Sequence, residues 1–204
     1  MELGPMENFV YLLGDSQTRE ALVVDPAWDV GAILKAAGKD GYRITGALIT
    51  HTHFDHVNGL EELLKKTDGT VYIHKNEAEF LKGMKQNVKK MTGGDKISIG
   101  SVEITLLHTP GHTPGSQCFL ADGNLISGDT LFINACGRCD LPGGSASAMH
   151  ESLSRLAKLD DATVLYPGHN YADLPTSTIG REKTENPYMR KMNLEGFLQF
   201  RMGW

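Results

Sequence analysis

The chain has 204 residues, of which 40% are hydrophobic and 22% charged, and this length and composition predict one soluble globular domain over residues 1–204. The formal net charge of −5 and a pI near 5.9 exclude the basic surface that nucleic acids or anionic membranes need. Since the sequence also shows no apolar run of roughly 20 residues, no signal-peptide pattern and only three cysteines, we expect a cytoplasmic protein that binds no membrane.

Short apolar runs alternate with helical patterns along the chain. Strands are predicted at residues 9–13, 21–25, 47–50, 71–74, 102–107, 116–120, 124–127 and 163–166. Helices are predicted at residues 30–37, 57–66, 77–84, 146–158, 178–185 and 194–201, with Asp29 as the N-cap of the first. Strands interleaved with helices indicate an α/β fold. Because neighbouring strand pairs also indicate antiparallel hairpins, mixed sheets are favoured over a doubly wound parallel sheet.

Side chains that bind metals gather where predicted strands end. The strand at 47–50 runs into an HxHxDH motif, and three later strands are each followed by a turn with glycine or proline and then by a histidine or an aspartate. The donors are His51, His53, Asp55, His56, His112, Asp129 and His169. Because rigid scaffolds present functional groups on loops at strand ends, we predict that these four loops converge on one centre.

Seven donors are too many for one ion. Tetrahedral zinc takes four ligands and keeps one position open when it is catalytic, whereas two ions that share a bridging carboxylate would use all seven. Every donor is nitrogen or oxygen, so we expect two divalent ions, zinc first, with iron or manganese as the alternatives.

These motifs, with Gly128-Asp129-Thr130 and Pro167-Gly168-His169, resemble the metallo-β-lactamase superfamily. Within it, the segments 128–132, 136–141, 177–180 and 186–187 are similar to the branch of glyoxalase II (hydroxyacylglutathione hydrolase) and persulfide dioxygenase. The resemblance implies a four-layer αββα sandwich, in which two mixed sheets are flanked by helices and the site lies along one edge. Glyoxalase II binds glutathione with a C-terminal helical domain, and the 35 residues after His169 are too few for such a domain. We therefore do not expect that domain, and we do not assume glutathione as the carrier of the acyl group.

The resemblance also implies roles for the donors. His51, His53 and His112 would hold one metal, Asp55, His56 and His169 the second, and Asp129 would bridge them. Asp25 would orient the ligands from behind.

The chemistry implied is hydrolysis by a metal-bridging hydroxide, which Asp55 would both help to bind and orient. A thiol with a pKa near 8.5 leaves as thiolate without a general acid, so an acyl thioester is favoured over an amide. Arg138, Tyr171 and Arg181 are candidates for binding the substrate, which we expect to be a small thioester or another thiol conjugate. We expect no nucleic-acid partner and leave the formation of a homodimer open.

The main alternative is a persulfide dioxygenase with one ferrous ion, held by a facial set such as His53, His112 and Asp129. A non-catalytic binding module is a further alternative, which the sequence does not favour. The CxxC spacing of Cys136 and Cys139 lacks the βαβ setting of a redox pair, so chance spacing is preferred. Structural or surface roles are expected for the remaining histidines, which are His74, His108 and His150.

Overall fold

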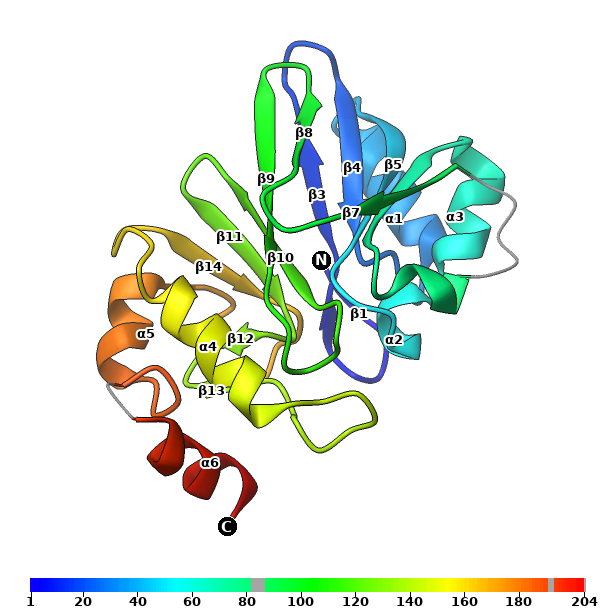
Figure 1. Cartoon of the computed structure of the whole chain (residues 1–204). Coiled ribbons are helices and arrows are strands. Elements are labelled where there is room, and N and C mark those ends of the chain that lie inside the picture. The colour runs from blue at the N-terminus through cyan, green and yellow to red at the C-terminus, as the bar shows by residue number, and fades with distance from the viewer. Residues whose placement is uncertain (82–86, 191–192, 204) are drawn as a thin grey trace.

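Two mixed β-sheets pack face to face in the computed structural model, which describes residues 1–81, 87–190 and 193–203 (Figure 1). The first sheet has the strand order β3-β4-β5-β6-β7. Its strands are β3 (Tyr11–Gly14), β4 (Glu20–Val24), β5 (Arg43–Ile49), β6 (Thr70–His74) and β7 (Val88–Met91). Only β3 and β4 pair antiparallel, and every other neighbouring pair is parallel.

The second sheet has the order β15-β14-β11-β10-β9-β8. Its strands are β8 (Lys96–Ile99), β9 (Val102–His108), β10 (Gln117–Ala121), β11 (Asn124–Gly128), β14 (Val164–Pro167) and β15 (Ser177–Thr178). All neighbours are antiparallel except β11 and β14. Two small ribbons complete the strands, β1 (Glu2–Leu3) with β2 (Asn8–Phe9) and β12 (Leu131–Phe132) with β13 (Ala135–Cys136).

Helices cover the outer face of each sheet (Figure 1). The helices are α1 (Val30–Lys39), α2 (Phe54–Val57), α3 (Leu60–Thr67), α4 (Ala146–Leu156), α5 (Ile179–Glu185) and α6 (Leu194–Met202), and Ala78–Leu81 forms a 3₁₀ turn, η1. No helix in the described ranges is long and apolar enough to cross a membrane.

Three apolar cores fill the three gaps between the layers. The first, around Ile33 and Leu63, packs α1 and α3 against the first sheet. The second lies between the sheets and includes Leu48 and Phe119. The third packs α4, α5 and α6 against the second sheet, with Met149 at its centre. The predicted αββα sandwich of mixed sheets is confirmed.

Two predicted helices differ from the structure. The helix predicted at 57–66 is α3, which begins later, at Leu60, and Val57 is the last residue of the separate helix α2. The two helices are separate because the chain turns at Gly59, whose N–H donates to the Pro26 carbonyl at 3.1 Å. A Cβ at Gly59 would lie 2.9 Å from that oxygen, so the turn requires glycine. The helix predicted at 77–84 is the short η1, and residues 82–86 lie outside the described ranges. Asp29 caps α1 as predicted, accepting from Ala32 N at 2.8 Å.

Candidate metal centre

The predicted donors all lie at one edge of the sandwich, and the first group joins two loops. His53 Nδ1 lies 3.1 Å from His51 Nε2 and 2.9 Å from His112 Nε2. His51 and His112 are buried. Three ring nitrogens therefore point at a common position that a cation could occupy.

The second group joins α2 to the loop after β14. His56 Nε2 lies 3.1 Å from His169 Nε2 and 3.3 Å from Asp55 Oδ2, and His169 Nε2 lies 3.4 Å from the same carboxylate oxygen. All three side chains are buried. Two imidazoles and a carboxylate here form a second set of metal-binding atoms.

Asp129 lies between the two groups. Its Oδ2 is 3.5 Å from His112 Nε2 in the first group and 3.4 Å from His169 Nε2 in the second, and its Oδ1 is 3.4 Å from His56 Nε2. Oδ1 is buried without a hydrogen-bond partner. A buried carboxylate oxygen that lacks a partner is costly, and a cation between the two groups would satisfy it. The donor set therefore fits divalent metal ions.

Glycines allow this close approach. Gly128 has a φ of +50°, and a Cβ there would lie 2.6 Å from the Thr50 side chain, which directly precedes the HxHxDH motif. A Cβ at Gly168 would collide with the Asp129 carboxylate. The glycines that precede Asp129 and His169 are therefore what lets these loops meet.

In four of the histidines, the ring nitrogen Nδ1, which faces away from the centre, contacts another group of the protein. His112 Nδ1 donates to the Arg138 carbonyl and His169 Nδ1 to the Met6 carbonyl, both at 2.8 Å. His56 Nδ1 lies 3.0 Å from Asp25 Oδ2, and His51 Nδ1 lies 3.0 Å from the Thr50 hydroxyl. A proton held at Nδ1 leaves the Nε2 lone pair facing the centre, which is the tautomer that binds metal.

Asp25, which the sequence predicts to orient the ligands, lies behind the centre beside His56. Besides facing His56, its carboxylate accepts from Thr50 N at 2.7 Å and from the Thr50 hydroxyl at 2.6 Å. It is buried and has a φ of +50°, so the chain holds it in a conformation that aspartate rarely adopts. Asp25 thus connects the end of β4 to the start of the HxHxDH loop.

The pKa shifts differ between the two groups of donors. Burial lowers the pKa of His51 well below its ordinary value, and His56 adds to this effect. Burial also lowers the pKa of His53, together with His112. Burial would raise the pKa of Asp129, but His56, His169 and His51 together outweigh burial and hold that pKa well below its usual range. Burial would lower the pKa of His56 and of His169, but neighbouring carboxylates, chiefly Asp129, raise both. Because imidazole binds metal in its neutral form, a metal ion in the second group would displace protons from these two rings, whereas His51 and His53 are already neutral and Asp129 is ionised.

Asn8 supports the centre, although it is not among the residues predicted from the sequence. This fully buried residue of β2 donates from Nδ2 to Asp55 Oδ2 at 2.9 Å and accepts from Trp28 Nε1 at 2.7 Å. The chain Trp28–Asn8–Asp55 therefore fixes the Asp55 carboxylate. In the sequence, Asn8 is simply a polar residue next to an apolar run. Nothing in its local pattern indicates that it binds Asp55.

Glu77 is not among the predicted residues either. It is buried after β6 and accepts from Thr52 N at 3.1 Å and from Gly115 N at 2.9 Å. One carboxylate thus ties the loop of His51 to the loop that carries His112.

The centre opens into a cavity of about 600 Å³. Arg138 and Tyr171, two of the three predicted substrate-binding residues, line this cavity. The third, Arg181, does not: it lies on α5 and pairs with Glu185 at 2.7 Å. The substrate role predicted for Arg181 is therefore not supported by its position.

The remaining cysteines and histidines take no part in the donor set. Cys136 and Cys139 are buried free thiols, and burial raises the pKa of Cys136 to about 12. His74 and His108 stack on each other with ring centroids 3.9 Å apart. His150 packs near Phe197 in the third core, with ring centroids 5.3 Å apart.

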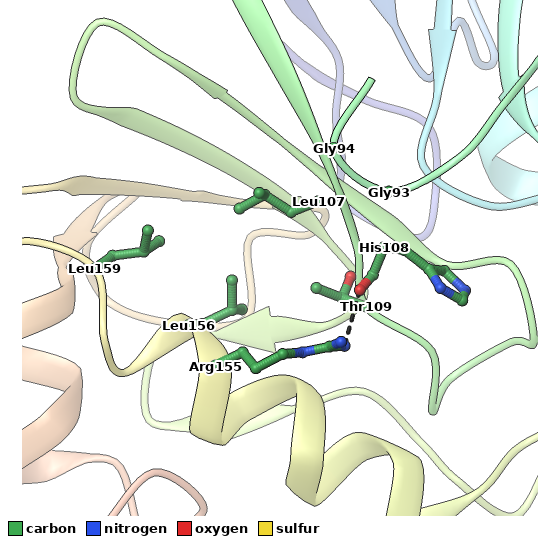
Figure 2. Close-up of a pocket in the computed structure, with 8 residues that line it drawn as sticks. All are labelled: Gly93, Gly94, Leu107, His108, Thr109, Arg155, Leu156 and Leu159. Atoms are coloured by element: carbon green, nitrogen blue, oxygen red, sulfur yellow. Dashed lines mark hydrogen bonds between the residues drawn. The ribbon is translucent and has the colours of Figure 1, made fainter. Parts of the chain in front are cut away.

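A second cavity, of about 450 Å³, lies between the end of β9 and the end of α4 (Figure 2). Arg155 crosses it and donates to the His108 carbonyl at 2.8 Å. None of the seven donors lines this cavity. The chemistry of the centre therefore belongs to the first cavity.

Comparisons with known proteins agree with this geometry. The sequence model described as the metallo-beta-lactamase superfamily matches residues 3–169. The probable polyketide biosynthesis zinc-dependent hydrolase PksB of Bacillus subtilis is 32% identical over 195 residues, covering 95% of this chain and 87% of that protein. The hydroxyacylglutathione hydrolase of Shewanella loihica is 32% identical over 216 residues, covering 90% of this chain and 82% of that protein.

A solved structure shares the fold and about a third of the sequence. ETHE1 from Myxococcus xanthus superimposes with a TM-score of 0.88 at 32% identity, over 97% of this chain and 86% of that one. Together with the sequence matches, this shows that the chain belongs to the metallo-beta-lactamase superfamily.

Proposed function

We propose that the chain is a metal-dependent hydrolase that cleaves acyl thioesters. The observation that carries the proposal is Asp129, a carboxylate between two groups of nitrogen and oxygen donors, of which one oxygen is buried without a hydrogen-bond partner. His51, His53 and His112 would hold one ion, Asp55, His56 and His169 the other, and Asp129 would bridge them. A pair of divalent ions there would polarise a carbonyl and supply hydroxide near neutral pH.

The chain's own residues orient the reacting groups. Because Asn8 occupies one side of the Asp55 carboxylate, that carboxylate is held toward the cavity, where it can accept a hydrogen bond from the attacking water. The Nδ1 contacts of the histidines keep their rings from turning. A thiolate leaving group needs no proton, and this favours a thioester over an amide.

The relatives support hydrolysis, since PksB and the Shewanella loihica protein both carry a hydrolase name, and the first of these names specifies zinc. They do not agree on a substrate. The two names share hydrolysis, and the acyl thioester is our own proposal for the substrate.

The test is hydrolysis of thioesters by protein of measured metal content. Zinc-loaded chain is assayed for thiol release from lactoylglutathione and from acyl thioesters of N-acetylcysteamine. We expect turnover that rises with metal content toward about two ions per chain. Full activity at less than one ion per chain, or no release from any of these thioesters, would contradict the proposal.

A second candidate is oxidation of a persulfide at one ferrous ion. The resemblance of residues 136–138 and 177–180 to the persulfide dioxygenase branch favours it. An oxygen electrode decides between the two functions: iron-loaded protein would consume oxygen with glutathione persulfide as the second candidate requires, whereas the hydrolase consumes none.

A further inference from the structure

We infer that the cavity over the metal centre receives an apolar acyl group, and that Phe54 and Tyr171 select for it. The inference rests on the proposed function and adds the class of acyl group. Apart from the metal-binding donors, the lining is mainly apolar or aromatic, with Met6, Phe54, Phe132, Leu141, Pro142 and Tyr171. Such a wall favours hydrocarbon over polar groups.

Two aromatic rings stand exposed at this cavity. Phe54 is 73% exposed and Tyr171 58% exposed, although burial of such rings is favourable. Each ring contacts another aromatic ring. Phe54 lies edge-on to Trp28 with ring centroids 6.2 Å apart, and Tyr171 stacks on His169 with ring centroids 4.7 Å apart and an interplanar angle of 8°. Rings held in place but left uncovered form an apolar surface that is ready to bind a ligand.

These rings border the two groups of donors. Phe54 lies between His53 and Asp55 in sequence, and Tyr171 lies two residues after His169. Phe132 is buried beside the second group, 5.9 Å from the His169 ring and 5.6 Å from the Tyr171 ring. A carbonyl at the centre would therefore have apolar side chains next to its acyl substituent.

The charges of the lining argue against a polar acyl group or an anionic anchor. Among the described residues of the lining, Arg138 is the only lysine or arginine. The Arg138 guanidinium donates two hydrogen bonds to the Asp140 carboxylate, from Nε at 3.1 Å and from Nη2 at 2.6 Å. A carboxylate in the cavity would have to compete with Asp140, and amide groups of a carrier would lose water without gaining partners. The acyl chain therefore packs against the apolar side chains of the cavity, and the polar carrier remains in solvent outside the cavity.

The first experiment varies the acyl chain on one carrier. Zinc-loaded protein is given acetyl, butanoyl and hexanoyl thioesters of N-acetylcysteamine, and lactoyl and 2-methylpropanoyl thioesters as a pair that differs by a hydroxyl in place of a methyl. We expect kcat/KM to rise about two- to fourfold per methylene and to favour the 2-methylpropanoyl over the lactoyl ester. Equal values across the series, or a preference for lactoyl, would overturn the inference.

The second experiment removes one ring. Phe54→Ala is compared with Phe80→Ala, a matched control, because Phe80 is 72% exposed and does not line the cavity. We expect Phe54→Ala to lower kcat/KM for hexanoyl about tenfold through KM, to leave acetyl within about twofold, and to keep the metal content. An equal loss for both esters would contradict selection by Phe54.

A binding measurement separates this inference from the proposed function. Hexanoate and acetate, the products of two of the esters, are titrated into zinc-loaded protein, with and without Phe54→Ala. Binding of hexanoate that is tighter than that of acetate by about 16-fold or more, at twofold or more for each of four methylenes, and that is weakened by Phe54→Ala, supports the apolar cavity even if no thioester is hydrolysed. Hydrolysis of all thioesters with equal binding of both acids would instead leave the hydrolase standing and refute the apolar selection.

Discussion

Asp129 is the residue on which both donor groups depend, since it lies within 3.5 Å of ring nitrogens in each. We predict that Asp129→Asn reduces metal content from about two ions per chain to less than one, whereas His169→Ala keeps about one ion, held by the first group. Elemental analysis of purified protein measures both. His108→Ala is the matched control, because His108 lies outside the centre and the metal content should not change. Equal losses in the two ligand variants would contradict a bridging Asp129.

Asn8 acts on the centre only through Asp55. Replacing it by alanine removes the amide that holds the carboxylate and leaves Trp28 Nε1 without its acceptor. We expect Asn8→Ala to lower kcat/KM about 10- to 100-fold with the protein still folded, as is common for residues that support metal ligands. Asn87→Ala is the control, because Asn87 is exposed and does not line the cavity, and it should leave kcat/KM unaltered. Unchanged kinetics in Asn8→Ala would refute the positioning role.

At the scale of elements, the ribbon of β12 and β13 supplies part of the cavity wall and is fastened from α5. Asn186, fully buried just after α5, donates from Nδ2 to the carbonyls of Phe132 and Ala135 at 3.1 and 3.0 Å. Glu182 is also fully buried and accepts from Asn134 N at 2.8 Å. The 177–187 segment that resembles the glyoxalase II branch thus holds the ribbon that follows Asp129.

This fastening predicts a stability effect. Asn186→Ala leaves two carbonyls and the Glu182 carboxylate short of a donor, so the free energy of unfolding should fall by about 3 kcal/mol. Urea denaturation measures this. Asn193→Ala removes only the N-cap of α6 and should cost about 1 kcal/mol. A smaller loss for Asn186→Ala than for Asn193→Ala would count against the fastening.

At the scale of the whole molecule, the two sheets pack on each other through an apolar core, and the centre lies at one edge of this sandwich. Phe119 of β10 is 1% exposed in the core between the sheets. We predict that Phe119→Ala lowers the free energy of unfolding by about 3–5 kcal/mol, because it leaves a cavity between the sheets. Phe80→Ala, at an exposed position, should change it by less than about 0.5 kcal/mol. Similar unfolding midpoints for the two variants would show that the sheets do not depend on this core.

The sequence pattern by itself determined the donor types and an α/β fold with mixed sheets, whereas the four-layer arrangement was implied by the family resemblance. Each donor follows a strand that is apolar enough to recognise locally, and the Asp29 cap is also a local signal. Short strands such as β7, with the sequence Val-Lys-Lys-Met, could not be recognised because their pairing comes from a neighbour rather than from their own pattern.

Only the tertiary structure decided which residues support the donors. Asn8 reaches Asp55 across 47 residues of sequence, and the Met6 carbonyl reaches His169 across 163. It also placed Arg181 outside the cavity while leaving Phe54 exposed at its wall. Such contacts depend on how distant loops meet, and a periodic pattern in the sequence carries no information about them.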